Sequence, residues 1–348
     1  MPAPTRFTRP AALAAAQLKR VLVVVAAVCV GGLAAGVGPA MAAFPGQNGK
    51  IAFASAFGGF FEGTSDIYTM SPNGRHLRNL TPNSPANDDF PRWSADGRMI
   101  VFWSTRTGPD NPTGDQEIFV MNANGSGLRQ LTDNTVDDGA PAWSPNGNRL
   151  VFHRWLPDAS EADPGAFQAD LITVRVNGTG ERNLTRSRGI SDYQAVWSPD
   201  GREIVFARDD SGFENDIYTI RPDGSHLRAL TATPTDEESP DWSPDGKRIA
   251  FQADAAMPGE QWDLYVIRRD GGSPPIRLTT AGGYHAAWSP NGRKIVFNNS
   301  TLVDHDRLFT MRADGSHPKQ RTVRPQFQDN HPDWQPVPKD ARAEDDDD

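Results

Sequence analysis

The sequence predicts an all-β fold, a six-bladed β-propeller built from four-stranded antiparallel blades. A tryptophan motif recurs at intervals of 45 to 54 residues, and each full copy is followed by the same succession of short β-branched strands and tight turns. Two incomplete copies at the ends of the repeat complement each other. Sheets arranged radially in a closed ring leave only short, protected edges, which suits such a repeat. The motif tryptophans are Trp93, Trp143, Trp197, Trp242, Trp288 and Trp334.

Residues 1–42 are predicted to be a cleavable signal peptide. An apolar run at 21–38 is followed by the small-x-small pattern Ala40-Met41-Ala42, after which cleavage is expected. Two alternatives are a retained membrane anchor, because the run borders on spanning length, and a lipid anchor on Cys29. The signal predicts a secreted, periplasmic or cell-envelope protein without a membrane span after cleavage. Its positive start is made by Arg6, Arg9, Lys19 and Arg20.

The charge of the mature chain argues against one class of partner. The whole chain has a formal net charge of −9, and loss of residues 1–42 leaves 31 Lys and Arg against 44 Asp and Glu, a net charge of −13. A surface of this sign is soluble and repels nucleic acid. Cys29 is the only cysteine and leaves with the signal, so no disulfide, thiolate nucleophile or cysteine metal site is expected.

The first and second strands of each unit flank a W-S-x-[DN]-G turn. Five copies are complete: WSADG at 93, WSPNG at 143, WSPDG at 197, WSPDG at 242 and WSPNG at 288. Each leads into a β-branched strand. These second strands are MIVF at 99–102, RLVF at 149–152, EIVF at 203–206, RIAF at 248–251 and KIVF at 294–297.

The sixth unit is split between the two ends of the propeller. NGKIAF at 48–53 lacks its tryptophan, and Trp334 in WQPVP lacks its turn. If the ring closes, a strand near 330–336 supplies what the first blade lacks, so the N- and C-terminal strands share one blade. A flat array or solenoid is the alternative, but it leaves the split unit without a purpose.

The third and fourth strands form a second hairpin in each unit. Asn-Gly or Asp-Gly dipeptides follow the third strands and tolerate the positive φ that tight turns demand, and short strands ending in L-T close most units. The propeller is thus expected over 43–337, followed by a disordered acidic tail at 338–348. The third strands are DIYTM at 66–70, EIFVM at 117–121, DLITV at 170–174, DIYTI at 216–220, DLYVI at 263–267 and RLFTM at 307–311.

The pattern W-S-P-[DN]-G-x-x-[IL]-x-F, followed by D-[IL]-Y-x-[MI] and L-T, resembles the TolB-type, WD-like propeller repeat over residues 44–337. Related blades occur in TolB of the Tol-Pal envelope system, in the propellers of prolyl-oligopeptidase-like peptidases and in oligogalacturonate lyases. The α/β domain that precedes the TolB propeller is not expected here, and the chain contains no G-x-S-x-G nucleophile motif. The resemblance therefore implies fold more strongly than function.

Charges are predicted to separate by face. The tight turns should lie on one face with basic residues, among them Arg228, Lys247, Arg293 and Lys294, and the longer loops on the other. We expect the loop face to bind a cation or a basic protein segment. The alternatives are acids that bond loop amides and keep the protein soluble, and a Ca²⁺ site. The predicted acidic site residues are Asp88, Asp89, Asp137, Asp138, Asp192, Asp236, Glu238 and Asp329.

Aromatic residues divide into two groups. The motif tryptophans recur at one position per unit and are expected to pack blade against blade. Irregular aromatics in or beside the long loops are candidates for stacking on a sugar or anchoring a peptide. These candidates are Phe61, Trp103, Trp155, Phe213 and Trp262.

Two histidines and a glutamine share one register, three residues before a motif tryptophan. They are His285, His331 and Gln194. Histidines on adjacent inner strands can converge on a transition metal, and the resemblance to oligogalacturonate lyases implies a metal held by His and Gln. The alternative is two half-buried histidines bonded to backbone.

The predicted function is a non-catalytic binding scaffold, a monomer that binds an envelope or extracellular protein or peptide. No catalytic residue is assigned, because paired carboxylates are too numerous to single out a general acid and base. One alternative is an enzyme that acts on a polysaccharide or small substrate in the central channel, in a metal-dependent reaction. Another is a relative of peptidase propellers that presents peptides.

Overall fold

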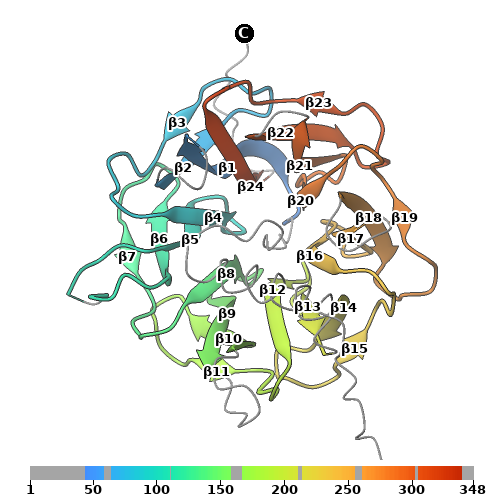
Figure 1. Ribbon diagram of the computed structural model, residues 1–348, viewed down its shortest axis with the longest axis horizontal. Helices are drawn as coiled ribbons and strands as arrows, with labels where there is room; N and C mark the ends of the chain where they lie inside the picture. Colours follow the sequence, from blue (N-terminus) through green and yellow to red (C-terminus); the bar gives the residue numbers. More distant parts are fainter. Residues whose placement is uncertain are drawn as a thin grey trace, which may run out of the picture. The chain divides into compact units, whose positions relative to one another are not determined.

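The computed structural model describes residues 44–58, 64–109, 111–157, 167–210, 214–254, 261–301 and 305–338. It confirms the six-bladed propeller, with six four-stranded antiparallel sheets around a common axis (Figure 1). All regular structure in these ranges is β-strand, and they contain no helix able to cross a membrane. The predicted signal peptide and acidic tail lie outside the described residues.

The sheets follow one another in chain order, each from the axis to the rim. The first is β24 (Phe327–Val337), β1 (Gln47–Phe57), β2 (Ser65–Met70) and β3 (Arg78–Asn79), and the second is β4 (Asp88–Trp93), β5 (Met99–Ser104), β6 (Glu117–Asn122) and β7 (Arg129–Gln130). The third is β8 (Asp138–Trp143), β9 (Arg149–Pro157), β10 (Phe167–Arg175) and β11 (Arg182–Asn183), and the fourth is β12 (Ser191–Trp197), β13 (Ile204–Asp209), β14 (Asn215–Ile220) and β15 (Arg228–Ala229). The last two are β16 (Glu237–Trp242), β17 (Arg248–Asp254), β18 (Trp262–Arg268) and β19 (Ile276–Arg277), then β20 (Tyr284–Trp288), β21 (Lys294–Thr301), β22 (His305–Arg312) and β23 (Lys319–Gln320).

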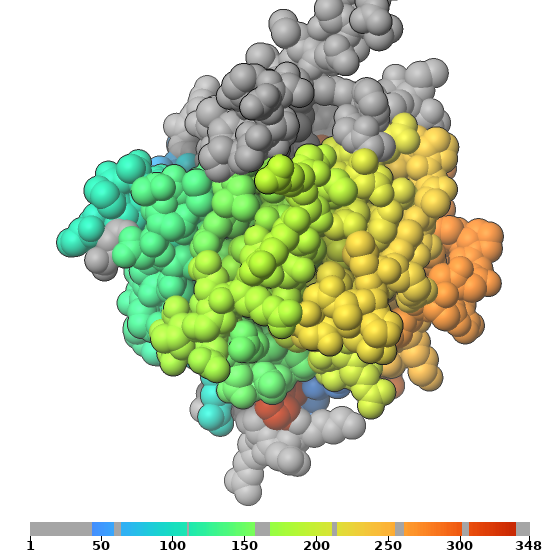
Figure 2. Space-filling view, turned by 90° about the horizontal axis from the view of Figure 1, so that it is seen from below, coloured from blue at the N-terminus to red at the C-terminus, as the bar shows by residue number. Residues whose placement is uncertain are grey.

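The ring closes as predicted, through a blade that both ends of the chain share. β24 pairs antiparallel with β1 and places Trp334 opposite Ile51. β24 is thereby the inner strand of the blade that β1 begins. Figure 2 shows the sheets in chain order around the rim, with atoms of the first and last described segments side by side at the lower edge.

The Asn-Gly and Asp-Gly turns differ in one respect from the predicted geometry. Only the glycine of each pair has a positive φ, as at Gly74 (87°) and Gly224 (82°). The preceding Asn or Asp instead accepts a backbone N–H two residues later: Asn73 Oδ1 lies 2.9 Å from the nitrogen of Arg75. This is the Asx-turn geometry that these side chains favour.

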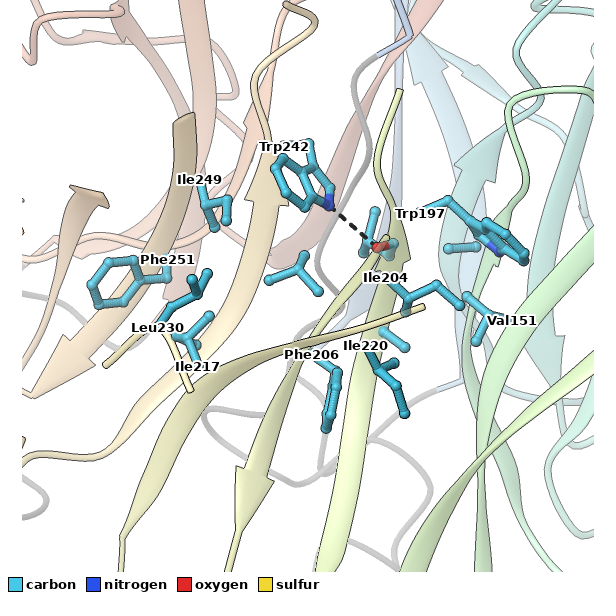
Figure 3. Packing of buried hydrophobic residues seen from close by; sticks show 14 of the residues in the cluster. Val151, Trp197, Ile204, Phe206, Ile217, Ile220, Leu230, Trp242, Ile249 and Phe251 are labelled. Atoms are coloured by element: carbon cyan, nitrogen blue, oxygen red, sulfur yellow. Dashed lines mark hydrogen bonds between the residues drawn. The ribbon is translucent and has the colours of Figure 1, made fainter. Parts of the chain in front are cut away.

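The motif tryptophans pack between blades, as expected. Trp242 lies between the β12–β15 and β16–β19 sheets among apolar side chains of both (Figure 3), and its indole N–H donates to the carbonyl of Val196, 3.3 Å away. Trp143 makes the equivalent bond to the carbonyl of Arg92 at 3.1 Å. Each blade is thus fixed to its neighbour by a buried aromatic side chain with a hydrogen bond at two of these junctions.

Candidate binding site at the propeller axis

The six inner strands share one local distortion. Three residues before each motif tryptophan, a residue other than glycine has a φ between 49° and 58°, and the strand register shifts there. Such bulges redirect side chains, and positive φ is uncommon in residues with a Cβ. The ring consists of Phe90, Ala140, Gln194, Ser239, His285 and His331.

Three side chains of this ring lie against one another. The His331 imidazole lies between Phe90, with ring centroids 3.6 Å apart, and His285, with centroids 4.3 Å apart. These residues come from β4, β20 and β24, which are neighbouring inner strands. The two histidines that share one register thus lie side by side at the axis.

The hydrogen bond that each imidazole forms through Nδ1 determines the protonation of its other nitrogen, Nε2. Nδ1 of His285 lies 2.8 Å from Oδ1 of Asn330, and Nδ1 of His331 lies 2.7 Å from Oδ1 of Asp89. An amide or carboxylate oxygen accepts, so each Nδ1 donates and, in a neutral ring, Nε2 keeps its lone pair. Burial lowers the pKa of both histidines well below the ordinary value and so keeps the rings neutral.

Asp89 is the acidic member of this cluster. Its Oδ1 also accepts the N–H of Phe90 at 2.6 Å, while Oδ2 has no hydrogen-bond partner among the described residues. Burial raises the pKa of Asp89 to about 7. Nε2 of His285 and Nε2 of His331 likewise have no partner in that part of the chain. Three acceptor atoms from three strands are therefore buried at the axis without a bonded donor from any residue that the structure describes.

Four of the predicted acidic site residues form internal ion pairs instead. They stand five residues before a motif tryptophan, and their side chains are fully buried. Oδ1 of Asp138 lies 2.6 Å from Nε of Arg154, and Asp192 and Arg208 repeat that pair at the same distance. Their charge is thus compensated within the blade. The pairs are Asp88–Arg106, Asp138–Arg154, Asp192–Arg208 and Asp329–Arg324.

The remaining predicted acids differ in their surroundings. Glu238 is buried on β16 and accepts from the amides of Asn215 and Gln252, at 3.2 and 3.3 Å. Asp137 and Asp236 are half-buried and accept backbone N–H bonds from Gln116 and Asn215. Asp89 and Glu238 stand four residues before their tryptophans and Asp137 and Asp236 stand six before theirs, so the predicted acids belong to three registers rather than one.

Gln194 forms its hydrogen bond with a different strand from those that the two histidines contact. Its Oε1 accepts the N–H of Ser239 on β16 at 2.6 Å, and its Nε2 has no partner among the described residues. Within the described ranges, no group of three or more His, Cys, Asp and Glu side chains is arranged to hold a metal ion.

The predicted aromatic candidates also differ in their burial and in their neighbours. Trp103 is buried in the apolar core with Phe90, whereas Trp155 and Trp262 are half-buried. Trp155 stacks on Tyr193, with centroids 6.4 Å apart. Phe61 and Phe213 lie outside the described residues.

A charged group that the sequence analysis missed lies further along the inner strands. Arg92, Asp241 and Asp333 each stand one residue before a motif tryptophan and are buried. Oδ2 of Asp333 accepts the N–H of Trp93 at 2.7 Å, and Oδ2 of Asp241 accepts that of Trp288 at the same distance. Burial lowers the pKa of Arg92 to about 10 and raises that of Asp333 to about 7. The arginine in FPRW, where the other copies have Asp, Ala or Val, was the available signal.

Known proteins share this architecture. The family model for the TolB beta propeller domain matches residues 154–338. An uncharacterised protein of Agrobacterium fabrum is 30% identical over 145 residues, which cover 41% of this chain and 47% of that protein. Dipeptidyl-peptidase 5 of Porphyromonas endodontalis is 27% identical over 117 residues, 33% of this chain and 15% of the peptidase. The chain thus spans less than half the length of these relatives.

A solved structure extends the likeness of fold. TolB from Acinetobacter baumannii superposes with a TM-score of 0.68 and 19% identity, over 84% of this chain and 68% of that one. At this level of identity, the match concerns the fold alone.

Proposed function

This chain belongs to the TolB beta-propeller domain family, and from that membership we propose that it is a non-catalytic binding module for a protein or peptide segment. The segment binds at the axis, where the inner strands β4, β20 and β24 meet. The proposal rests on one observation: Asp89, His285 and His331 bury three acceptor atoms that have no donor among the described residues. A peptide supplies such donors through its backbone N–H groups and through Lys, Arg and N-terminal amines.

The site is narrower than a general acidic face. Asp88, Asp138, Asp192 and Asp329 are compensated by arginines, so they contribute rigidity rather than attraction. Asp89 forms no ion pair with an arginine in the described ranges, and it is the acid that we expect a cationic side chain to meet at the axis. The partner is an envelope or extracellular protein, and the propeller binds it as a secreted or periplasmic monomer.

Affinity capture tests this function. The immobilised protein is exposed to an envelope extract of its own source, and bound proteins are identified by mass spectrometry. Asp89→Asn presents an N–H₂ group where the ligand expects an acceptor, so the specific partner should be lost. Asp223→Asn, the same change on an exposed turn, is the matched control and should retain it. Equal retention by both variants would remove Asp89 from the site.

The Asp89–His331 pair favours a second candidate function. A carboxylate that accepts from Nδ1 orients a neutral imidazole whose Nε2 can take a proton, which is the arrangement of a general base. The substrate would be a polysaccharide or small molecule at the axis, with Ca²⁺ or a transition metal as the alternative cofactor. Turnover of a glycan panel by the wild type, abolished in His331→Gln, would favour this enzyme over the binding module.

A further inference from the structure

We propose that a groove on the tight-turn face, between the β16–β19 and β20–β23 sheets, binds a phosphate group. The groove has a volume of about 520 Å³. Four of its charged side chains are cations and one is an anion, in a chain whose net charge is −9. It is lined by Arg248, Arg293, Lys294, Arg312, Ala313 and Asp314.

Two of the cations are directly opposite each other. Lys294 on β21 pairs in register with Arg312 on β22, and Arg293 precedes Lys294 in the turn. Like charges in this arrangement destabilise a sheet. None of the three forms an ion pair with another described residue, and all three side chains are exposed. An anion bound between them would relieve the repulsion.

A third strand brings Arg248 from the neighbouring blade. Its guanidinium lies over the ring of the buried Trp288, 4.6 Å from the centroid. This cation–π contact positions the guanidinium at the groove without neutralising its charge. The cations thus come from two blades and surround one space.

The single acid of the groove is already engaged. Oδ1 of Asp314 accepts the N–H of Ser316 at 2.9 Å and so fixes the β22–β23 turn. No ion pair joins Asp314 to the four cations within the described residues. An excess of three positive charges remains.

In the neighbouring groove, by contrast, two arginines are compensated by ion pairs with acids. It has a volume of about 890 Å³, shares Arg248 with the first groove and contains further arginines. There Arg268 is paired with Asp270 at 2.7 Å, and Arg269 is paired with Asp200 at 2.9 Å and with Glu203 at 2.8 Å. No ion pair of this kind joins Arg293, Lys294 or Arg312 to another residue that the structure describes. Guanidinium forks and an ammonium point charge together match the oxygens of a phosphate.

Titration calorimetry of the full chain with inorganic pyrophosphate at low ionic strength tests the site. The wild type should bind, and Lys294→Gln/Arg312→Gln should weaken binding at least tenfold. The matched control is Arg149→Gln/Arg175→Gln, which removes the like-charged pair at the corresponding position of β9 and β10. Circular dichroism verifies that each variant is folded.

A second arm distinguishes the source of the phosphate. Vesicles of phosphatidylcholine with phosphatidylglycerol are sedimented with each protein, and only differences between variants are compared. Loss of cosedimentation in the groove variant alone identifies a lipid headgroup, whereas an effect on pyrophosphate alone identifies a soluble phosphate. If the groove variant behaves as the control in both arms, the proposal is wrong.

Discussion

Asp89 and His331 are 242 residues apart in the chain, yet Oδ1 of the first lies 2.7 Å from Nδ1 of the second. Asp89 belongs to the second sheet, and His331 belongs to β24, which reaches the axis because it pairs with β1. The strand that closes the ring is therefore also the strand that completes the candidate site. Closure and the proposed binding therefore depend on the same segment.

Trp334 should be essential for closure. Trp334→Ala removes a side chain that is 2% exposed and should lower the free energy of unfolding by about 3–5 kcal/mol. Denaturant unfolding followed by fluorescence measures the change. Trp155→Ala, at a half-buried tryptophan, should cost clearly less. Equal costs would contradict the closing role of β24.

Removal of Arg154 should leave a buried charge uncompensated. The Asp138 side chain is fully buried, and Arg154 holds both of its oxygens, at 2.6 and 2.9 Å. Arg154→Ala is expected to destabilise the protein by about 3–5 kcal/mol. Arg268→Ala breaks an exposed pair with Asp270 and should change the melting temperature little. A tolerant response to Arg154→Ala would show that Asp138 does not depend on its partner.

Substitutions at two glycines distinguish the cost of backbone strain from the cost of a close contact. Gly125 and Gly147 both have positive φ, 85° and 69°. A Cβ on Gly125 would lie 2.8 Å from the carbonyl oxygen of Leu80 in the neighbouring blade, whereas Gly147 has nothing within 4 Å. Gly147→Ala should cost about 1 kcal/mol from its backbone conformation alone. Gly125→Ala should lower the melting temperature further, and an equal shift would contradict the tight contact between blades.

The ionisation of Asp89 should make stability depend on pH. Its pKa is about 7 in the folded protein and near 3.8 when unfolded, so between these values the folded state binds more protons. Stability is therefore lost as pH rises from about 4 to 7. Asp89→Asn removes this loss, so the melting temperature of the variant relative to the wild type should rise between pH 4 and 8. The expected gain is on the order of a few kcal/mol.

His153 and the axial histidines oppose this trend below pH 6.5. Burial lowers the pKa of His153 to about 3, so its unfolded form binds the extra proton and stability rises with pH in that range. The comparison of Asp89→Asn with the wild type cancels the contribution of His153, whose pKa shift has burial as its cause and not Asp89. A difference in melting temperature that is constant with pH would contradict the raised pKa of Asp89.

The fold was predictable because it depends on a repeated local signal. The turn motif, the alternation of strands and the split unit at Trp334 and NGKIAF determine the number of blades and their closure, each through short-range chemistry. It was harder to predict which residues of the inner strands have the same surroundings. The predicted acids stand four, five or six residues before their tryptophans, and successive residues of a strand point to opposite faces, so Asp89 and Asp138 have different surroundings.

The site was predictable only in part because its contacts join distant blades. His285 and His331 stood out by their shared register, but their partners Asn330 and Asp89 follow from which strands adjoin at the axis. The acid–arginine pairs could not be foreseen, because Arg154 and Arg208 lie in second strands where no motif marks them. A count of acidic residues therefore overstated the charge of the loop face.

Binding at the axis is tested most directly by the affinity of one peptide for this site. A peptide selected on the wild-type protein from a random display library is titrated calorimetrically into His331→Gln and into His226→Gln, the same substitution at an exposed turn. We expect at least a tenfold loss of affinity in His331→Gln and none in His226→Gln. Unchanged affinity in a folded His331→Gln protein would show that peptides bind elsewhere on the propeller.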